Sequence, residues 1–156
     1  MLENVTVLQL LTSYLPVMHT KIQWHNNVHF TAVGDSGHAV EIDGAPDAGG
    51  ENLGSRPMEL MLMGLGGCTS FDVIQILKKS RQDVTECVTQ VTASRTQTIP
   101  QVFETIHLHF VICGENLDER KVARAISLSA DKYCSASIML ERGGVQITHD
   151  YEVHQV

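Results

Sequence analysis

The sequence contains little positive charge. Its 156 residues include 11 Lys and Arg but 18 Asp and Glu, so the formal net charge is −7. Binding to nucleic acid depends on clustered Lys and Arg that neutralise phosphates, and the chain has no such cluster. We therefore expect no nucleic-acid partner, and an anionic membrane surface is disfavoured for the same reason.

Signals for export and for membrane insertion are also missing. Residues 1–17 are fairly apolar, but they include Glu3 and no Lys or Arg. A secretory signal begins with a basic region, and a spanning helix needs about 20 apolar residues. The 4 cysteines are then expected to be reduced thiols of a cytoplasmic protein rather than a disulfide framework. The segment 1–17 is either an upstream extension before a start at Met18 or a helical arm that packs on a partner subunit.

Several signatures of catalysis and metal binding are absent. No Gly-rich phosphate loop follows a predicted strand, and no Ser/His/Asp signature, CxxC pair or HExxH pair occurs. His107, His109 and Cys113 share one face of a predicted strand, and His-x-His can chelate zinc. Without a second chelating pair we interpret them as a row of cross-strand polar residues. The sequence thus predicts no cofactor and no metal site.

The composition is that of one globular domain, which we place at residues 18–156. With 43% hydrophobic and 19% charged residues, a chain of this length buries roughly two thirds of the surface that its unfolded form exposes. Short alternating segments between residues 22 and 42 predict a hairpin or small meander. The segment 43–55, rich in Gly, Pro and Asp, predicts a surface loop and a candidate lid over a site.

A long helix is predicted from Pro57 to about Ser80. Proline suits a first helical turn, and Glu59 there complements the helix dipole. Residues 60–65 are apolar almost all round, which indicates burial on several sides, at the centre of the fold or in a dimer interface. Its glycines, Gly64, Gly66 and Gly67, each cost about 1 kcal/mol relative to Ala, so we expect another backbone to approach closely there.

The second half of the chain predicts an antiparallel pair of strands, an amphipathic helix and a last strand. The pair comprises residues 84–98 and 103–113, and the helix follows Asn116 as its N-cap, with Glu119 in a capping-box arrangement. The last strand carries an apolar face from Val145 to Val153. Strand runs interrupted by two helices, with hairpin connections, predict an α+β fold with an antiparallel sheet.

Two cysteines are candidates for redox chemistry. Cys68 lies inside the long helix after a run of small residues, and Cys134 precedes a short predicted helix that starts at Ser135, with Lys132 nearby. Positive charge or a helix N-terminus stabilises a thiolate, whereas Asp72 would disfavour the Cys68 thiolate if it faced the same way. From the residues alone, a redox pair and two buried small residues are both open interpretations. Cys87 and Cys113 are expected to be small hydrophobic residues on strands.

The chain resembles the superfamily of osmotically induced protein C (OsmC) and organic hydroperoxide resistance protein (Ohr), and its YhfA-type branch in particular. The resemblance extends from about Lys21 to the C-terminus. It rests on four segments: Arg56–Cys68, Arg81–Val84, Leu128–Ser135 and Ile147–Val153.

The resemblance implies an intertwined homodimer, with antiparallel sheets around two long central helices and two sites lined by both subunits. It also implies a peroxidatic Cys68 and a resolving Cys134, which would reduce organic hydroperoxides through a sulfenic acid and a disulfide. A dithiol reductant of unknown identity would reset the pair.

The chain departs from the peroxidase pattern at two places. Family peroxidases have Glu directly after the first proline of the helix, where Met58 stands here, and Glu59 is turned by about 100° from that position. They also have an Arg in the N-terminal hairpin, whereas none occurs between residues 22 and 42. We predict Glu59 and Arg56 as the supporting residues of the site. Arg81 is a further candidate to replace the missing hairpin Arg. The alternative is a relative that binds a small apolar ligand or handles sulfur without cycling its cysteines.

Overall fold

The computed structural model describes residues 17–156 of the chain. The prediction of an extension or arm at residues 1–17 therefore falls outside the described residues, apart from Val17. The chain divides into two compact units, one reaching to Pro57 and the other spanning Met58–Val156. Each unit is described by itself below.

The first unit contains the predicted meander. Strands β1 (Thr20–Asn26), β2 (His29–Gly34) and β3 (Ala39–Ile42) pair antiparallel in this order. Asn27 adopts a positive φ of 45° in the short turn between β1 and β2, a conformation that Asn tolerates better than most residues.

The loop after β3 is built around a buried carboxylate. It includes the short 3-10 helix η1 (Pro46–Ala48), and most of its residues are at the surface, as predicted. Asp43 is only 1% exposed and accepts hydrogen bonds from the backbone N–H groups of Gly44, Glu51 and Leu53 at 2.7, 2.9 and 3.0 Å. These bonds, with that of Leu53 the largest, lower the pKa of Asp43. The two ends of the loop are therefore held together, while its role as a lid stays a prediction.

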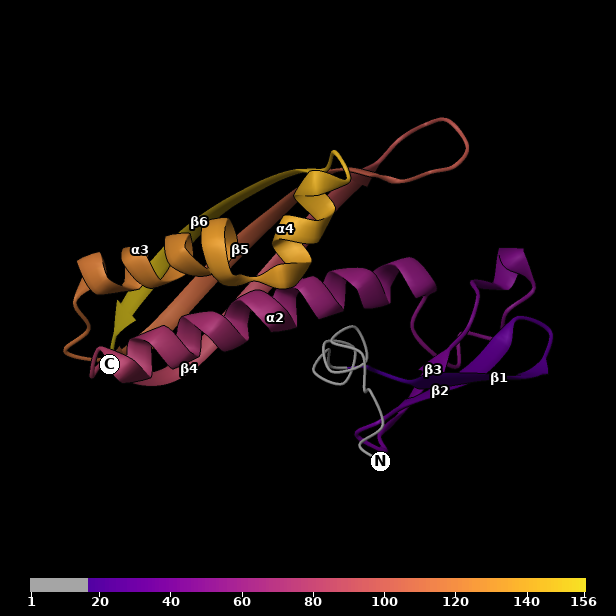
Figure 1. Cartoon of the computed structure of the whole chain (residues 1–156), viewed down its shortest axis with the longest axis horizontal. Helices are drawn as coiled ribbons and strands as arrows, with labels where there is room; N and C mark the ends of the chain where they lie inside the picture. The colour runs from indigo at the N-terminus through magenta and orange to yellow at the C-terminus, as the bar shows by residue number, and fades with distance from the viewer. Residues whose placement is uncertain (1–16) are drawn as a thin grey trace, which may run out of the picture. The chain divides into compact units, whose positions relative to one another are not determined.

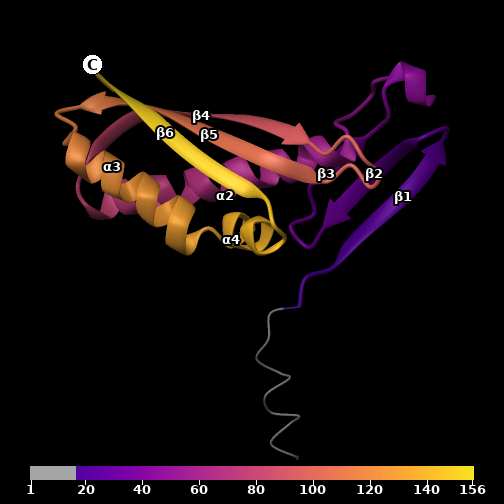
Figure 2. The same ribbon diagram turned by 90° about the horizontal axis from the view of Figure 1, so that it is seen from above.

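The second unit is a sheet covered on one face by helices. The sheet has the order β4 (Asp83–Arg95), β5 (Phe103–Glu115), β6 (Gln146–Gln155). The helices are α2 (Pro57–Lys79), α3 (Glu119–Leu128), the π-helical turn η2 (Ser129–Tyr133) and α4 (Ser135–Arg142). In Figures 1 and 2 these helices all lie along the same side of the three strands.

The core of this unit lies between the sheet and the helices. On β5 the residues 106, 108, 110 and 112 are buried, and the residues between them are more exposed, which is the alternation expected of a strand with one covered face. Val122, Ala125 and Ile126 on α3 and Leu65, Val73 and Leu77 on α2 complete this cluster. The predicted α+β class is confirmed.

Two details differ from the sequence prediction. Strand β6 pairs parallel to β5, not antiparallel, because the chain between them runs through α3, η2 and α4, and such a crossover returns the strand in the same direction. Helix α3 is capped by Asp118, whose side chain accepts a hydrogen bond from the N–H of Arg120 at 3.0 Å. Asn116, the predicted cap, instead has a positive φ of 49° in the preceding turn.

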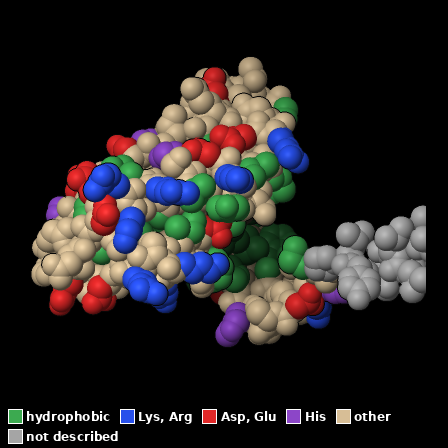
Figure 3. All heavy atoms as spheres, turned by 60° about the vertical axis from the view of Figure 1, so that its left-hand side comes forward, with side chains coloured by type: hydrophobic (Ala, Val, Ile, Leu, Met, Phe, Trp, Pro, Cys, Tyr) green, Lys and Arg blue, Asp and Glu red, His purple; other side chains and the backbone are tan. Residues whose placement is uncertain are grey.

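Helix α2 is buried on one side and open on the other within a single chain. Met63 and Phe71 are 56% and 66% exposed, and a Cβ added to Gly64 or Gly67 would meet no atom of the described chain within 4 Å. Residues 17–156 of one chain therefore do not provide the predicted burial on several sides or the close backbone contact. Figure 3 shows how hydrophobic side chains reach the surface among scattered charged ones. By length and hydropathy α2 also passes the test for a membrane span, as core helices of soluble proteins do.

Candidate functional site

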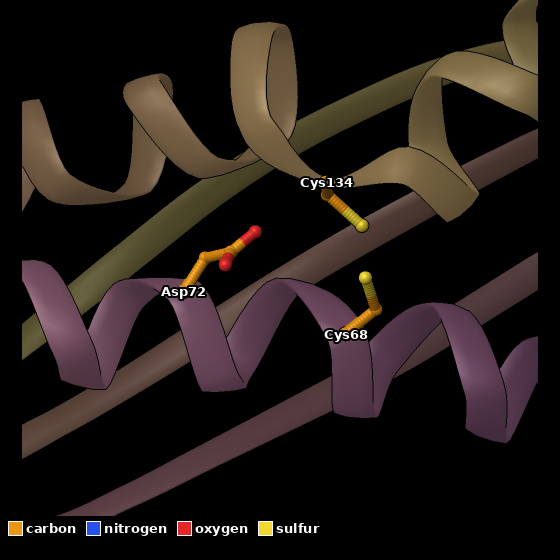
Figure 4. Close-up of side chains that lie close together, drawn as sticks. All are labelled: Cys68, Asp72 and Cys134. Atoms are coloured by element: carbon orange, nitrogen blue, oxygen red, sulfur yellow. The ribbon is translucent and has the colours of Figure 1, made fainter. Parts of the chain in front are cut away.

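The fold brings Cys68 and Cys134 together. Cys68 projects from α2 and is half-buried, while Cys134 follows η2 and is fully buried. Their sulfurs and a carboxylate oxygen of Asp72 all lie within 4.8 Å of one another. In Figure 4 the two sulfurs point toward each other across the space between α2 and the chain before α4. The geometry therefore places the two free thiols next to each other.

A break in helical geometry places Cys134. The backbone N–H of Cys134 bonds to the carbonyl of Ser129, five residues earlier, at 2.9 Å, which is the π-helical pattern that often marks functional sites. Cys134 then turns to extended backbone and caps α4, and its sulfur accepts the N–H of Ser137 at 3.5 Å. The predicted short helix behind Cys134 is thus confirmed. The ammonium nitrogen of Lys132, the nearby positive charge in the sequence, lies 5.7 Å from the ring centroid of Tyr133.

A buried hydrogen bond connects the two cysteine-bearing segments. The hydroxyl of Ser129, at the start of η2, donates to the backbone carbonyl of Thr69 at 2.9 Å, and both residues are fully buried. Thr69 directly follows Cys68, so this bond fixes the spacing between the two thiols. The sequence reasoning placed Ser129 on the apolar stripe of a helix but assigned it no role, although a polar residue on such a stripe is itself a signal of a specific partner.

The surroundings of Cys134 favour its neutral thiol. Burial is the main cause that raises the pKa of Cys134 to about 11, and its hydrogen bond with Cys68 acts in the same direction, while the N–H of Ser137 opposes it. Asp72, one helical turn after Cys68, does face the thiols, which is the arrangement that the sequence reasoning described as unfavourable for a thiolate. In the described part of the chain Asp72 has no ion pair or hydrogen bond.

Of the two predicted supporting residues, only Glu59 belongs to the same unit as the thiols, and it does not lie beside them. Glu59 is nine residues before Cys68, which places it on the opposite side of an α-helix. It lines a cavity of about 440 Å³ with Gly66, Gly67 and Ser70 among others. Arg56 belongs to the first unit, where its guanidinium donates to the side-chain oxygen of Asn52 at 2.6 Å. Their roles in a site that two subunits share stay predictions.

Two further cavities lie on the second unit near the helix faces that carry the thiols. One, of about 450 Å³, is mostly apolar and includes a single basic side chain, that of Arg95; its other lining residues include Met58, Met61, Phe103, Met139 and Val145. The other, of about 380 Å³, opens beside Asp72 and is also lined by Gln75, Lys79 and Tyr133. The first can receive an apolar molecule, and the second gives solvent and ions access to the carboxylate of Asp72.

The histidines on β5 pair with polar groups of the neighbouring strand. His107 bonds to the hydroxyl of Thr148 at 2.8 Å, and His109 contacts the carboxylate of Asp150 at 2.5 Å. The hydrogen bond from His109, and to a smaller extent the approach of His107 to Asp150 at 3.2 Å, lower the pKa of Asp150. The predicted row of cross-strand polar residues is confirmed. Among the residues that the structure describes, Cys68, Asp72 and Cys134 form the one group of three or more donors that could hold a metal ion.

The comparisons with known proteins agree with this geometry. Residues 49–150 match the family model described as OsmC-like protein, and the chain belongs to that family. It is 43% identical to Protein YhfA of Escherichia coli (strain K12) over 139 residues, which are 87% of this chain and 98% of YhfA. The predicted resemblance is therefore confirmed.

Solved structures show the same fold. A hypothetical protein from Aquifex aeolicus VF5 matches with a TM-score of 0.79 at 27% identity, covering 91% of this chain and 99% of that protein. An organic hydroperoxide resistance protein OsmC from Legionella pneumophila matches with a TM-score of 0.67 at 17% identity, covering 89% and 98%. The latter likeness shows the fold alone.

Proposed function

We propose that the protein is a thiol-dependent peroxidase that reduces organic hydroperoxides through a disulfide cycle between Cys68 and Cys134. The observation that carries this proposal is the pair of facing sulfurs, one half-buried and the other fully buried, within 4.8 Å of each other. The more accessible thiol meets the peroxide and the enclosed thiol resolves the product. Cys68 is therefore the attacking residue and Cys134 the resolving one.

The reaction proceeds in two steps that balance without a cofactor. The Cys68 thiolate attacks the terminal oxygen of the hydroperoxide, the O–O bond breaks, and the alkoxide leaves and takes up a proton as the alcohol. Cys68 is then a sulfenic acid. The Cys134 sulfur attacks the oxidised sulfur, water leaves, and a disulfide forms. A dithiol reductant restores both thiols by exchange.

A homodimer is part of this proposal. Helix α2 exposes Met63 and Phe71 beside Gly64 and Gly67, which no atom of residues 17–156 covers, and an exposed apolar face of this kind marks an interaction surface. A second copy that covers this face would restore the burial that the helix sequence predicts. It would also bring residues of both subunits to the 440 Å³ cavity beside Glu59.

The test is peptide mass spectrometry of reduced, chelator-treated protein after one equivalent of cumene hydroperoxide, compared with hydrogen peroxide. We expect a Cys68–Cys134 disulfide, faster with the organic peroxide, and a trapped Cys68 sulfenic acid in the Cys134→Ser variant. Cys113→Ser is the matched control, because this cysteine lies on the outer face of the sheet and is expected to leave the reaction unchanged. Two unmodified thiols in the wild type would refute the cycle.

A second candidate is binding of a small apolar ligand without turnover. The 450 Å³ cavity favours it, because apolar walls with one cation fit an apolar molecule that carries an anionic group. Saturable binding of a fluorescent fatty acid, lost in Arg95→Gln and in Met139→Asp, together with thiols inert to peroxide, would support this function over the first.

A further inference from the structure

We infer that reduced Cys68 and Cys134, together with Asp72, form a binding site for a thiophilic divalent cation of the zinc class. The positions of the three side chains support this site. Cys68 and Asp72 are separated by one turn of α2 and project from the same face, and Cys134 approaches them from the chain between η2 and α4 (Figure 4). Three donors from two rigid elements converge on one point.

The distances suit tetrahedral coordination. With zinc–sulfur bonds of about 2.3 Å and zinc–oxygen bonds of about 2.1 Å, a tetrahedral ion holds its ligand atoms roughly 3.6–3.8 Å apart. The donor atoms here lie within 4.8 Å of one another. No pair therefore needs to close by more than about 1.2 Å to reach these separations.

The charges of the site call for a cation. A carboxylate faces two thiols, and in the described residues no Lys or Arg forms an ion pair with Asp72. Removal of the thiol protons would bring three negative groups together, a state that a divalent ion stabilises strongly. The cavity beside Asp72 provides the path by which the ion enters.

The chemistry of the donors selects the metal. Two sulfurs and one carboxylate oxygen suit zinc, cobalt(II) and cadmium, whereas magnesium and calcium prefer oxygen ligands alone. Three protein ligands leave a fourth position for water. Close by, the hydroxyl of Ser137 is fully buried and has no hydrogen-bond partner among the described residues, so a polar group at this end of the site is still unsatisfied.

The experiment is an anaerobic titration of metal-free reduced protein with cobalt(II), followed by sulfur-to-cobalt charge-transfer absorption. We expect a plateau at one cobalt per chain, removal of the band by zinc, and no response to magnesium. Cys68→Ser and Cys134→Ser should abolish the two-sulfur band, Asp72→Asn should weaken binding at least about tenfold, and Cys113→Ser should leave it unchanged. No charge-transfer band in the reduced wild type, or full affinity in Asp72→Asn, would overturn the site.

A measurement on the wild type alone guards against variants that fail to fold. Zinc should slow alkylation of Cys68 by iodoacetamide without slowing that of Cys113, and equal rates with and without zinc would contradict the inference. The titration contains no peroxide and the disulfide assay contains chelator. A negative result in one experiment therefore refutes only the metal site or only the peroxidase cycle, and leaves the other proposal unaffected.

Discussion

At the scale of single residues, the hydrogen bond from Ser129 to the carbonyl of Thr69 controls how the two thiols meet. Ser129→Ala removes one buried hydrogen bond, which costs about 1 kcal/mol. We expect a lower melting temperature and a roughly fivefold slower Cys68–Cys134 disulfide formation, the factor that about 1 kcal/mol corresponds to. Stopped-flow mixing with cumene hydroperoxide measures the rate.

Ser127→Ala is the matched control for this prediction. Ser127 is also a serine of the same segment, but its hydroxyl donates to Asp131 at 2.8 Å on the exposed side. It should change neither the stability nor the rate. If Ser129→Ala lowered the melting temperature and left the rate unchanged, the bond would be structural only.

The sequence singled out both cysteines, but it could not show their distance. Cys68 and Cys134 are 66 positions apart in the sequence, and their contact depends on how η2 interrupts the helical path, which no local pattern reveals. Asp72 was recognised only as a conditional neighbour, since the i, i+4 spacing fixes a shared helix face but not a side-chain direction. The shared face of the β5 histidines followed from strand parity, but their pairing with β6 did not.

At the scale of elements, α2 makes a prediction about its glycines. A Cβ added at Gly64 or Gly67 meets no atom of the described chain within 4 Å, and in Gly64→Leu and Gly67→Leu the new residue favours a helix by about 0.8 kcal/mol over Gly. An isolated chain would therefore become more stable. In the proposed dimer a second copy packs against these positions, so we expect both variants to weaken association. The variant dimers should begin to dissociate at a higher protein concentration than the wild-type dimer.

Light scattering across a dilution series measures this effect. Gly37→Leu would not serve as a control, because Gly37 has a positive φ of 78° that Leu adopts poorly. Arg124→Leu, an exposed position on α3 rather than on this face of α2, is the suitable comparison. Unchanged dimers with higher melting temperatures in both glycine variants would show that this face is open to solvent.

The elements show where sequence reasoning works and where it stops. The long apolar helix, the β4–β5 hairpin and the meander follow from periodicity and turn residues, which act locally. The direction of β6 does not, because it depends on the path of three helical segments between β5 and β6. Likewise, the apolar composition of α2 predicted burial on several sides. Residues 17–156 of one chain bury only one side of this helix.

At the scale of the whole molecule, the proposed dimer raises the question of which chain supplies the resolving thiol. Both sulfurs of the site come from one chain and lie within 4.8 Å of each other. We therefore predict that peroxide produces an intrachain disulfide in the proposed dimer. Non-reducing electrophoresis should show a single species near the chain mass of 17.2 kDa, which migrates faster than the reduced form because its loop is closed.

Mixed dimers test the same point without relying on gel mobility. Cys68→Ser and Cys134→Ser chains, unfolded together and refolded, would each carry one thiol of the pair, on different subunits. Because the partner's thiol lies outside the intrachain site, peroxide should give no covalently linked dimer. A cross-linked band of about twice the chain mass, dependent on the remaining Cys68 and Cys134, would mean that the subunits exchange the segment after η2 and that each site is completed by its partner.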